Sequence, residues 1–199
     1  MSSTVEPAHE ADEALLLRFA RGDSVAFDTL YGRHELGVWR FVLRSVRDQA
    51  LADDLLQDVW FSVARQASNY QPTARFKTWL FTMARNRVID HFRTVKRHLS
   101  LDGAGNGDDE DTGGALADTV AADSGFGPLR QLQSRQQAGA LIAAVEQLPA
   151  EQREAFLLQV EGGMPVQEIA SATGVSFETA KSRLRYARNS LRQCLEEYS

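Results

Sequence analysis

Apolar residues recur at three- and four-residue steps through both halves of this 199-residue chain, and no segment shows the sustained alternation of a β-strand. This spacing predicts helices over 13–20, 24–42, 51–67 and 76–92 in the first half, and over 129–145, 151–160, 166–173 and 177–197 in the second. Ser24 and Ser176 are the candidate N-caps of the second and the last of these helices. The fold class predicted is therefore all-α.

An acidic, glycine-rich stretch separates the two halves. Between Ser100 and Leu129 there are seven acidic residues, seven glycines and no Lys or Arg. Such a segment cannot bury enough apolar surface to offset the entropy of ordering it, so it predicts a flexible linker. We expect a tail with a short helix (1–23), a small helical bundle (24–98), the linker (99–129) and a helix-turn-helix domain (130–199).

The charge of the chain is distributed unevenly. The net charge is −5, and the linker window alone carries −7, so the rest of the chain carries the difference, +2. Arg75–His98 has seven basic residues against one acid, and Lys181–Gln193 has five basic residues and none. Two basic segments separated by an acidic stretch predict two binding surfaces on two bodies.

Several classes of function have no residues to support them. Cys194 is the sole cysteine, the histidines His9, His34, His91 and His98 are scattered, and no phosphate-binding loop is present. There is no apolar run of membrane-spanning length and no signal-peptide pattern. We therefore expect a cytoplasmic protein that is not an enzyme, with no metal, no cofactor and no membrane insertion.

The last two predicted helices have the layout of a helix-turn-helix. A short helix, the turn Gly174-Val175-Ser176 and a long basic helix follow one another, and the second helix of such a unit enters the major groove. The alternative is an exposed basic helix without a role in DNA binding. The candidate duplex-binding residues are Thr179, Lys181, Ser182, Arg183, Arg185 and Arg188.

The first basic segment mixes aromatic and cationic residues, which suits unstacked bases because rings stack on bases and cations follow the backbone. The alternative is that most of these rings belong to the core of the bundle. The rings are Phe76, Trp79, Phe81 and Phe92, with Trp39, Trp60 and Tyr70 as further candidates. The stretch Asp53–Val59 is acidic and amphipathic, and indicates either a solvated face or a docking surface for a basic protein.

These motifs together resemble a bacterial RNA polymerase sigma factor of the small, two-domain, extracytoplasmic-function type. The resemblance covers about 26–97 and 141–192, and rests on Ala52–Trp60, Phe76–Leu80, Ala84–Asn86, Ile89-Asp90, Leu148-Pro149, Glu168–Ala170 and Thr179–Leu184. Leu51, Pro165, Glu178 and Ala180 depart from the usual family residues.

The resemblance implies a mechanism and the residues that perform it. Core RNA polymerase would dock on Asp53, Asp54, Leu55, Gln57 and Asp58. The melted non-template strand of the minus-ten promoter element would lie on Phe76, Lys77, Trp79, Asn86, Asp90 and Arg93, and the helix-turn-helix would bind the minus-thirty-five element as duplex. An anti-sigma factor is a further partner that the resemblance implies.

Two other classes of protein remain open at the sequence level. One is a stand-alone helix-turn-helix regulator whose first half serves as a sensor or dimerisation module, which would bind duplex tightly without polymerase. The other is a helical adaptor that binds proteins alone, and it would show no steep salt dependence of DNA binding.

The linker's charge leads to a first prediction. Changing Asp108, Asp109, Glu110 and Asp111 to Asn or Gln should raise the non-specific DNA affinity of the free protein, because the acidic chain repels DNA. The gain should be largest at low salt, where screening is weakest. A salt titration of DNA binding for both forms measures it, and superimposable curves would show that the linker is an inert spacer.

Overall fold

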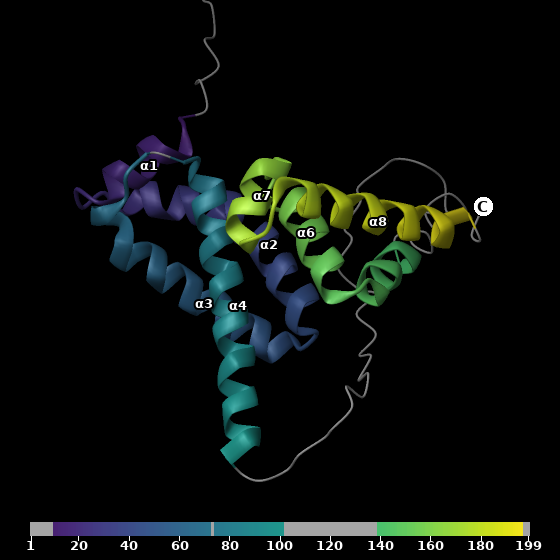
Figure 1. The fold of residues 1–199 in the computed structure, drawn as a ribbon. Coiled ribbons are helices and arrows are strands. Elements are labelled where there is room, and N and C mark those ends of the chain that lie inside the picture. The colour runs from purple at the N-terminus through teal and green to yellow at the C-terminus, as the bar shows by residue number, and fades with distance from the viewer. Residues whose placement is uncertain (1–9, 73, 102–138, 197–199) are drawn as a thin grey trace, which may run out of the picture. The chain divides into compact units, whose positions relative to one another are not determined.

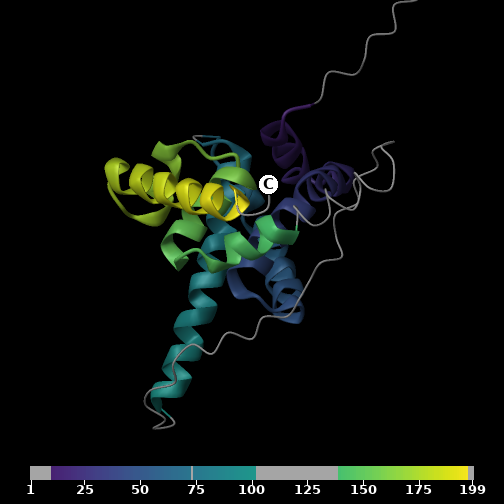
Figure 2. The same ribbon diagram turned by 90° about the vertical axis from the view of Figure 1, so that its right-hand side faces the viewer.

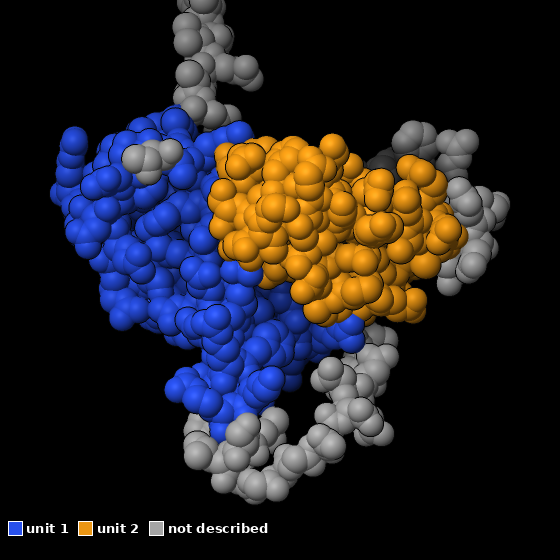
Figure 3. Space-filling view, viewed as in Figure 1, with its two compact units in different colours: residues 1–105, 161–163 blue, residues 106–160, 164–199 orange. Residues whose placement is uncertain are grey.

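A computed structural model of the protein describes residues 10–72, 74–101 and 139–196. Within these ranges the chain is helical and has no strands, which confirms the predicted fold class. It divides into two compact units (Figure 3). The predicted linker lies outside the described residues apart from 99–101, which are helical. None of the described helices is both long enough and apolar enough to cross a membrane.

The first unit is a bundle of four α-helices (Figure 1). They are α1 (Asp12–Phe19), α2 (Ser24–Val46), α3 (Gln49–Gln66) and α4 (Phe76–Leu101), with a short 3₁₀ helix, η1 (Ala67–Asn69), after α3. α2 packs against α1, α3 and α4. Its apolar stripe, which includes Leu30, Val38, Phe41 and Val42, is buried along the length of the helix.

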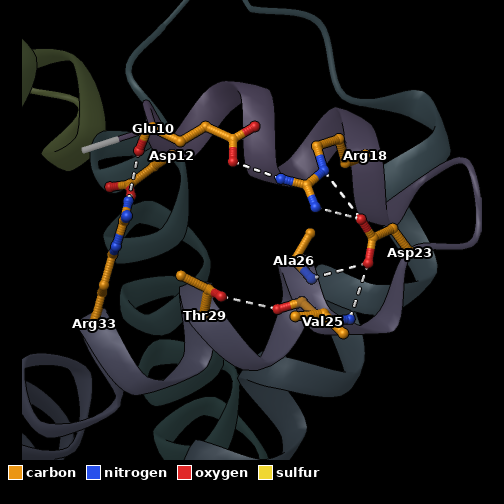
Figure 4. Close-up of polar contacts among 8 residues, drawn as sticks. All are labelled: Glu10, Asp12, Arg18, Asp23, Val25, Ala26, Thr29 and Arg33. Atoms are coloured by element: carbon orange, nitrogen blue, oxygen red, sulfur yellow. Dashed lines mark hydrogen bonds and ion pairs between the residues drawn. The ribbon is translucent and has the colours of Figure 1, made fainter. Parts of the chain in front are cut away.

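Asp23, and not the predicted Ser24, caps the N-terminus of α2. Its carboxylate accepts hydrogen bonds from the backbone N–H groups of Val25 at 3.1 Å and Ala26 at 3.4 Å (Figure 4). The hydrogen bond from the Arg18 guanidinium lowers the pKa of the same carboxyl. The contribution of Asp23 to stability is thus present near neutral pH and is lost as the pH falls through its folded-state pKa.

The short predicted helix near the N-terminus is α1, and it belongs to the bundle. Leu15 and Leu16 on its inner face are buried. Arg18 on its outer face pairs with Glu10 and Asp23, so the turn between α1 and α2 is held by charged groups (Figure 4).

α4 is the longest helix of the first unit. Its first half packs on α2 and α3 through buried side chains that include Leu80, Phe81, Ala84 and Val88. Its second half extends beyond the other helices of this unit in both views (Figures 1 and 2), and residues 92–97 are exposed.

The second unit contains the helical residues 139–147 followed by α6 (Ala150–Val160), α7 (Val166–Thr173) and α8 (Phe177–Glu196). α8 packs on α6 and α7 (Figure 2). Gly174 ends α7 with φ of 70°, a left-handed conformation that glycine adopts without strain. Ser176 caps α8 as predicted, because its hydroxyl accepts from the Thr179 backbone N–H at 3.1 Å.

The packing of α2 supports a prediction with an internal control. Leu30 is 0% exposed and Leu36, on the same helix, is 51% exposed. Leu30→Ala should destabilise the first unit by about 2–5 kcal/mol, because it leaves a cavity. Leu36→Ala should change stability by no more than about 0.5 kcal/mol. Urea unfolding of the full chain compares the two, and equal losses would contradict this packing.

Candidate nucleic-acid and polymerase interfaces

Four of the predicted single-strand residues share one face of α4. Trp79, Asn86, Asp90 and Arg93 follow one another at seven-, four- and three-residue steps, which align along a helix. Asn86, Asp90 and Arg93 are exposed, and Trp79 is partly exposed. Asp90 and Arg93 are 3.8 Å apart, with side chains 63% and 74% exposed, so the pair is open to solvent.

The other two predicted strand contacts lie elsewhere. Phe76 is 0% exposed, so the structure corrects its assignment: a fully buried ring has no face on which a base could stack. Lys77 lies on a different side of α4 from Trp79, and its ammonium sits 5.8 Å from the centre of the Phe81 ring.

Most of the aromatic set is core, as the alternative interpretation held. Phe81, Trp60 and Tyr70 are buried alongside Phe76, and their rings pack against those of neighbouring helices. Phe92, which is 49% exposed, and the partly exposed Trp79 are the predicted rings that α4 presents to solvent.

The basic helix α8 presents a charged stripe on its exposed side. Ala180, Leu184, Ala187 and Leu191 are buried against the rest of the unit. On the exposed side lie Lys181, Arg185, Arg188 and Arg192, spaced by three or four residues. The Arg185 guanidinium lies on the neighbouring Tyr186 ring, 5.0 Å from its centre, and Ser182 is half-buried.

Two of the predicted duplex contacts are hydrogen-bonded to α6, and a third belongs to the N-cap of α8. Arg183 is bound to the carboxylate of Glu151 on α6, and its side chain is 18% exposed. Arg188 donates to the Gln159 side-chain oxygen at 2.6 Å. Thr179 takes part in the N-cap of α8, where its hydroxyl lies 2.8 Å from that of Ser176. The sequence placed these residues on one helix but could not show that α6 would engage two of them.

The acidic face of α3 is exposed at the predicted positions, with one exception. Asp53, Asp54, Gln57 and Asp58 are exposed, and Asp53 accepts a hydrogen bond from the Trp39 indole at 2.7 Å. Leu55 is 7% exposed and packs into the core, so the structure corrects its assignment as a contact residue.

Sequence reasoning missed an aromatic residue on this face. Phe61 is 65% exposed and follows Asp54, Gln57 and Asp58 at helical spacing. Its absence from the apolar stripe of α3, which runs through Val59 and Val63, is the signal that could have revealed it.

Metal-ligand geometry is not seen in the described ranges, where no group of three His, Cys, Asp or Glu side chains is placed to hold an ion. Cys194, near the end of α8, is a free thiol of intermediate exposure.

Comparison with known sequences identifies the family to which both helical units belong. Residues 30–98 match the family model for sigma-70 region 2, and residues 138–191 match that for sigma-70 region 4. The chain is 35% identical over 180 residues to the RNA polymerase sigma factor CarQ of Myxococcus xanthus, covering 90% of this chain and 95% of the relative. It is 30% identical over 187 residues to the ECF RNA polymerase sigma factor SigK of Mycobacterium ulcerans, covering 92% of each.

The chain therefore belongs to the extracytoplasmic-function (ECF) RNA polymerase sigma factors, which are promoter-directing transcription initiation factors. The match to region 2 disfavours the stand-alone regulator, because that hypothesis gave the first unit a sensor or dimerisation role.

Solved structures share this fold at low sequence identity. The sigma factor RpoE of Bartonella quintana, solved with the anti-sigma factor NepR, aligns with a TM-score of 0.64 and 24% identity, covering 85% of this chain and 96% of that one. CnrH, solved with the cytosolic domain of CnrY, aligns with a TM-score of 0.62 and 21% identity, covering 96% and 100%.

Proposed function

We propose that the first unit binds core RNA polymerase through α3 and holds the melted minus-ten strand on α4, while the second unit binds the minus-thirty-five duplex through α8. The observation that supports this division is the sorting of exposed side chains among the three helices. α3 exposes acids, α4 exposes an aromatic with polar and basic groups, and α8 exposes a basic stripe.

The exposed face of α4 fits a single strand better than a duplex. Trp79 offers a partly exposed ring on which a base can stack. Asn86 supplies an amide that can both donate and accept hydrogen bonds to the edge of an unpaired base. Arg93, two turns further on, supplies a cation for the backbone of the same strand.

The exposed face of α3 combines three features of a protein-docking surface. Asp54 and Asp58 supply negative charge one helical turn apart, Gln57 lies between them, and Phe61 adds an exposed ring at the next turn. Exposed aromatic residues are enriched among the side chains that dominate binding energy at protein interfaces. Phe61 is therefore added to the proposed polymerase contacts, and Leu55 is assigned to the core beneath them.

Substitutions on α3 test the docking face. Reversing the charges with Asp54→Lys and Asp58→Lys should weaken core polymerase binding, and Phe61→Ala should weaken it by about tenfold. None of these should lower the melting temperature much, because all three side chains are exposed. Asp28→Ala, an exposed acid on α2, is the control. Fluorescence titration with core enzyme measures affinity, and wild-type affinity in the triple variant would reject this face.

The ion pair between α8 and α6 distinguishes the α8 side chains that can contact DNA from the one that holds the two helices together. Lys181 and Arg185 project from the stripe, with Lys181 62% exposed, and can reach bases or phosphates. Arg183 is held by Glu151, which also offsets its charge. We assign Lys181 and Arg185 to DNA contact and Arg183 to holding α8 against α6.

This assignment predicts different defects for two arginines on one helix. Arg185→Ala should weaken minus-thirty-five binding by about 1–3 kcal/mol. Arg183→Ala should leave the base preference unchanged and lower the stability of the second unit by up to about 1 kcal/mol, as a partly exposed ion pair does. Holoenzyme binding to promoters with single base changes, together with thermal unfolding, tells them apart. A relaxed base preference in Arg183→Ala alone would reverse the assignment.

We further infer that the protein acts in the cytoplasm. The polymerase performs the catalytic steps of transcription, and this protein performs none itself. An anti-sigma factor is a proposed regulator, because both structural neighbours named above were solved with a partner, described in one case as an anti-sigma factor.

A further inference from the structure

The acidic beginning of α1 contacts the beginning of α4, 63 residues later in the chain. The Glu13 carboxylate accepts a hydrogen bond from the Phe76 backbone N–H at 2.7 Å. The first N–H groups of a helix have no acceptor within the helix, so one must come from elsewhere. A carboxylate also interacts favourably with the positive end of the helix dipole, so Glu13 acts as a cap supplied from another helix.

The preceding residue, Asp12, ties the same end of α1 to α2. One oxygen of its carboxylate lies 2.7 Å from the His34 ring nitrogen Nε2, and the other accepts from the Arg33 guanidinium at 2.7 Å (Figure 4 shows Asp12 and Arg33). The His34 ring in turn packs on the Phe76 ring with centroids 5.4 Å apart. Two consecutive acids therefore fix the start of α4 relative to both α1 and α2.

The residues just before α4 are held by Tyr70. Its hydroxyl donates to the Ala74 carbonyl oxygen at 2.8 Å, and its ring meets the Trp79 ring edge-on at 5.1 Å. Burial first, and the negative charge of Glu13 second, raise the pKa of the Tyr70 hydroxyl. Tyr70 thus holds the backbone just before α4, and Glu13 holds the first residue of α4.

We propose that Glu13 is a positioning residue for capture of the melted promoter strand. It holds the first turn of α4 so that Trp79 is set in its binding orientation before DNA arrives. A site ordered in advance does not spend binding energy on ordering itself, so loss of the cap should weaken strand capture. This inference rests on the proposed contact between Trp79 and the single strand. Glu13 lies outside the residues 30–98 that match region 2.

A purely structural role for Glu13 would produce a different pattern. It would lower the stability of the whole first unit, and binding of polymerase and of the single strand would both decline with the folded fraction. A positioning role reduces single-strand binding while the protein remains folded and bound to polymerase.

The experiment uses the full chain reconstituted with core polymerase. A fluorescent single-stranded oligonucleotide with the minus-ten non-template sequence measures strand capture, and a duplex minus-thirty-five fragment measures the other surface. The variants are Glu13→Ala, Glu13→Gln, which keeps an acceptor oxygen, and Trp79→Ala as the reference for lost strand contact. Glu10→Gln is the matched control, since the Glu10 carboxylate pairs with Arg18 and not with α4. Circular dichroism sets a temperature at which every variant is folded.

We expect Glu13→Ala to weaken oligonucleotide binding about three- to tenfold, with duplex and polymerase affinities unchanged. Glu13→Gln should recover most of that loss, and Glu10→Gln should match the wild type. The inference is overturned if Glu13→Ala binds the oligonucleotide like the wild type while Trp79→Ala does not, or if Glu13→Ala weakens strand binding and polymerase binding equally. A Trp79→Ala variant with wild-type capture would instead refute the proposed strand contact.

Discussion

Burial of the apolar stripe of α2 is the constraint on which the first unit depends. This helix packs against each of the other three α-helices of its unit, and Leu30, Val38 and Phe41 fill the space between them. Because each surrounding helix must turn its own apolar side toward α2, its charged side is left facing outward. The acidic face of α3 and the mixed face of α4 are therefore consequences of core packing as much as of local sequence.

In the second unit, too, burial of the apolar side of a helix leaves its charged side exposed, and here the exposed charges are positive. α8 buries Ala180, Leu184 and Ala187, and this leaves its basic residues on the outside. Ala180 departs from the usual family residue but is fully buried, so that departure alters packing and not a surface that meets DNA. Glu178, the other departure on α8, is 77% exposed, with its carboxylate 3.9 Å from the Lys181 ammonium, and it stands at the helix end that enters the groove in a helix-turn-helix.

Acidic side chains in this protein have two different roles, and the degree to which each side chain is buried distinguishes the two. Asp12, Glu13 and Asp23 hold helix ends and neighbouring helices together inside the first unit. Asp54 and Asp58 have side chains exposed on α3, where they are available to a partner. Counting charge along the chain cannot distinguish these groups, because both kinds are acids near the ends or faces of amphipathic helices.

The sequence by itself determined the helical class, the division into two bodies, the helix-turn-helix and the basic character of α4 and α8. These follow from local rules: the 3.6-residue period, the glycine that ends α7, the Ser176 cap, and an acidic stretch too polar to form a core. Only the tertiary structure decided which side chains on those helices reach solvent. Phe76 and Leu55 lie in the core, Arg183 is held by Glu151, and Phe61 is exposed, because each outcome depends on a neighbouring helix distant in sequence. The contact between Glu13 and Phe76 spans 63 residues, and no local pattern specifies a pairing over that separation.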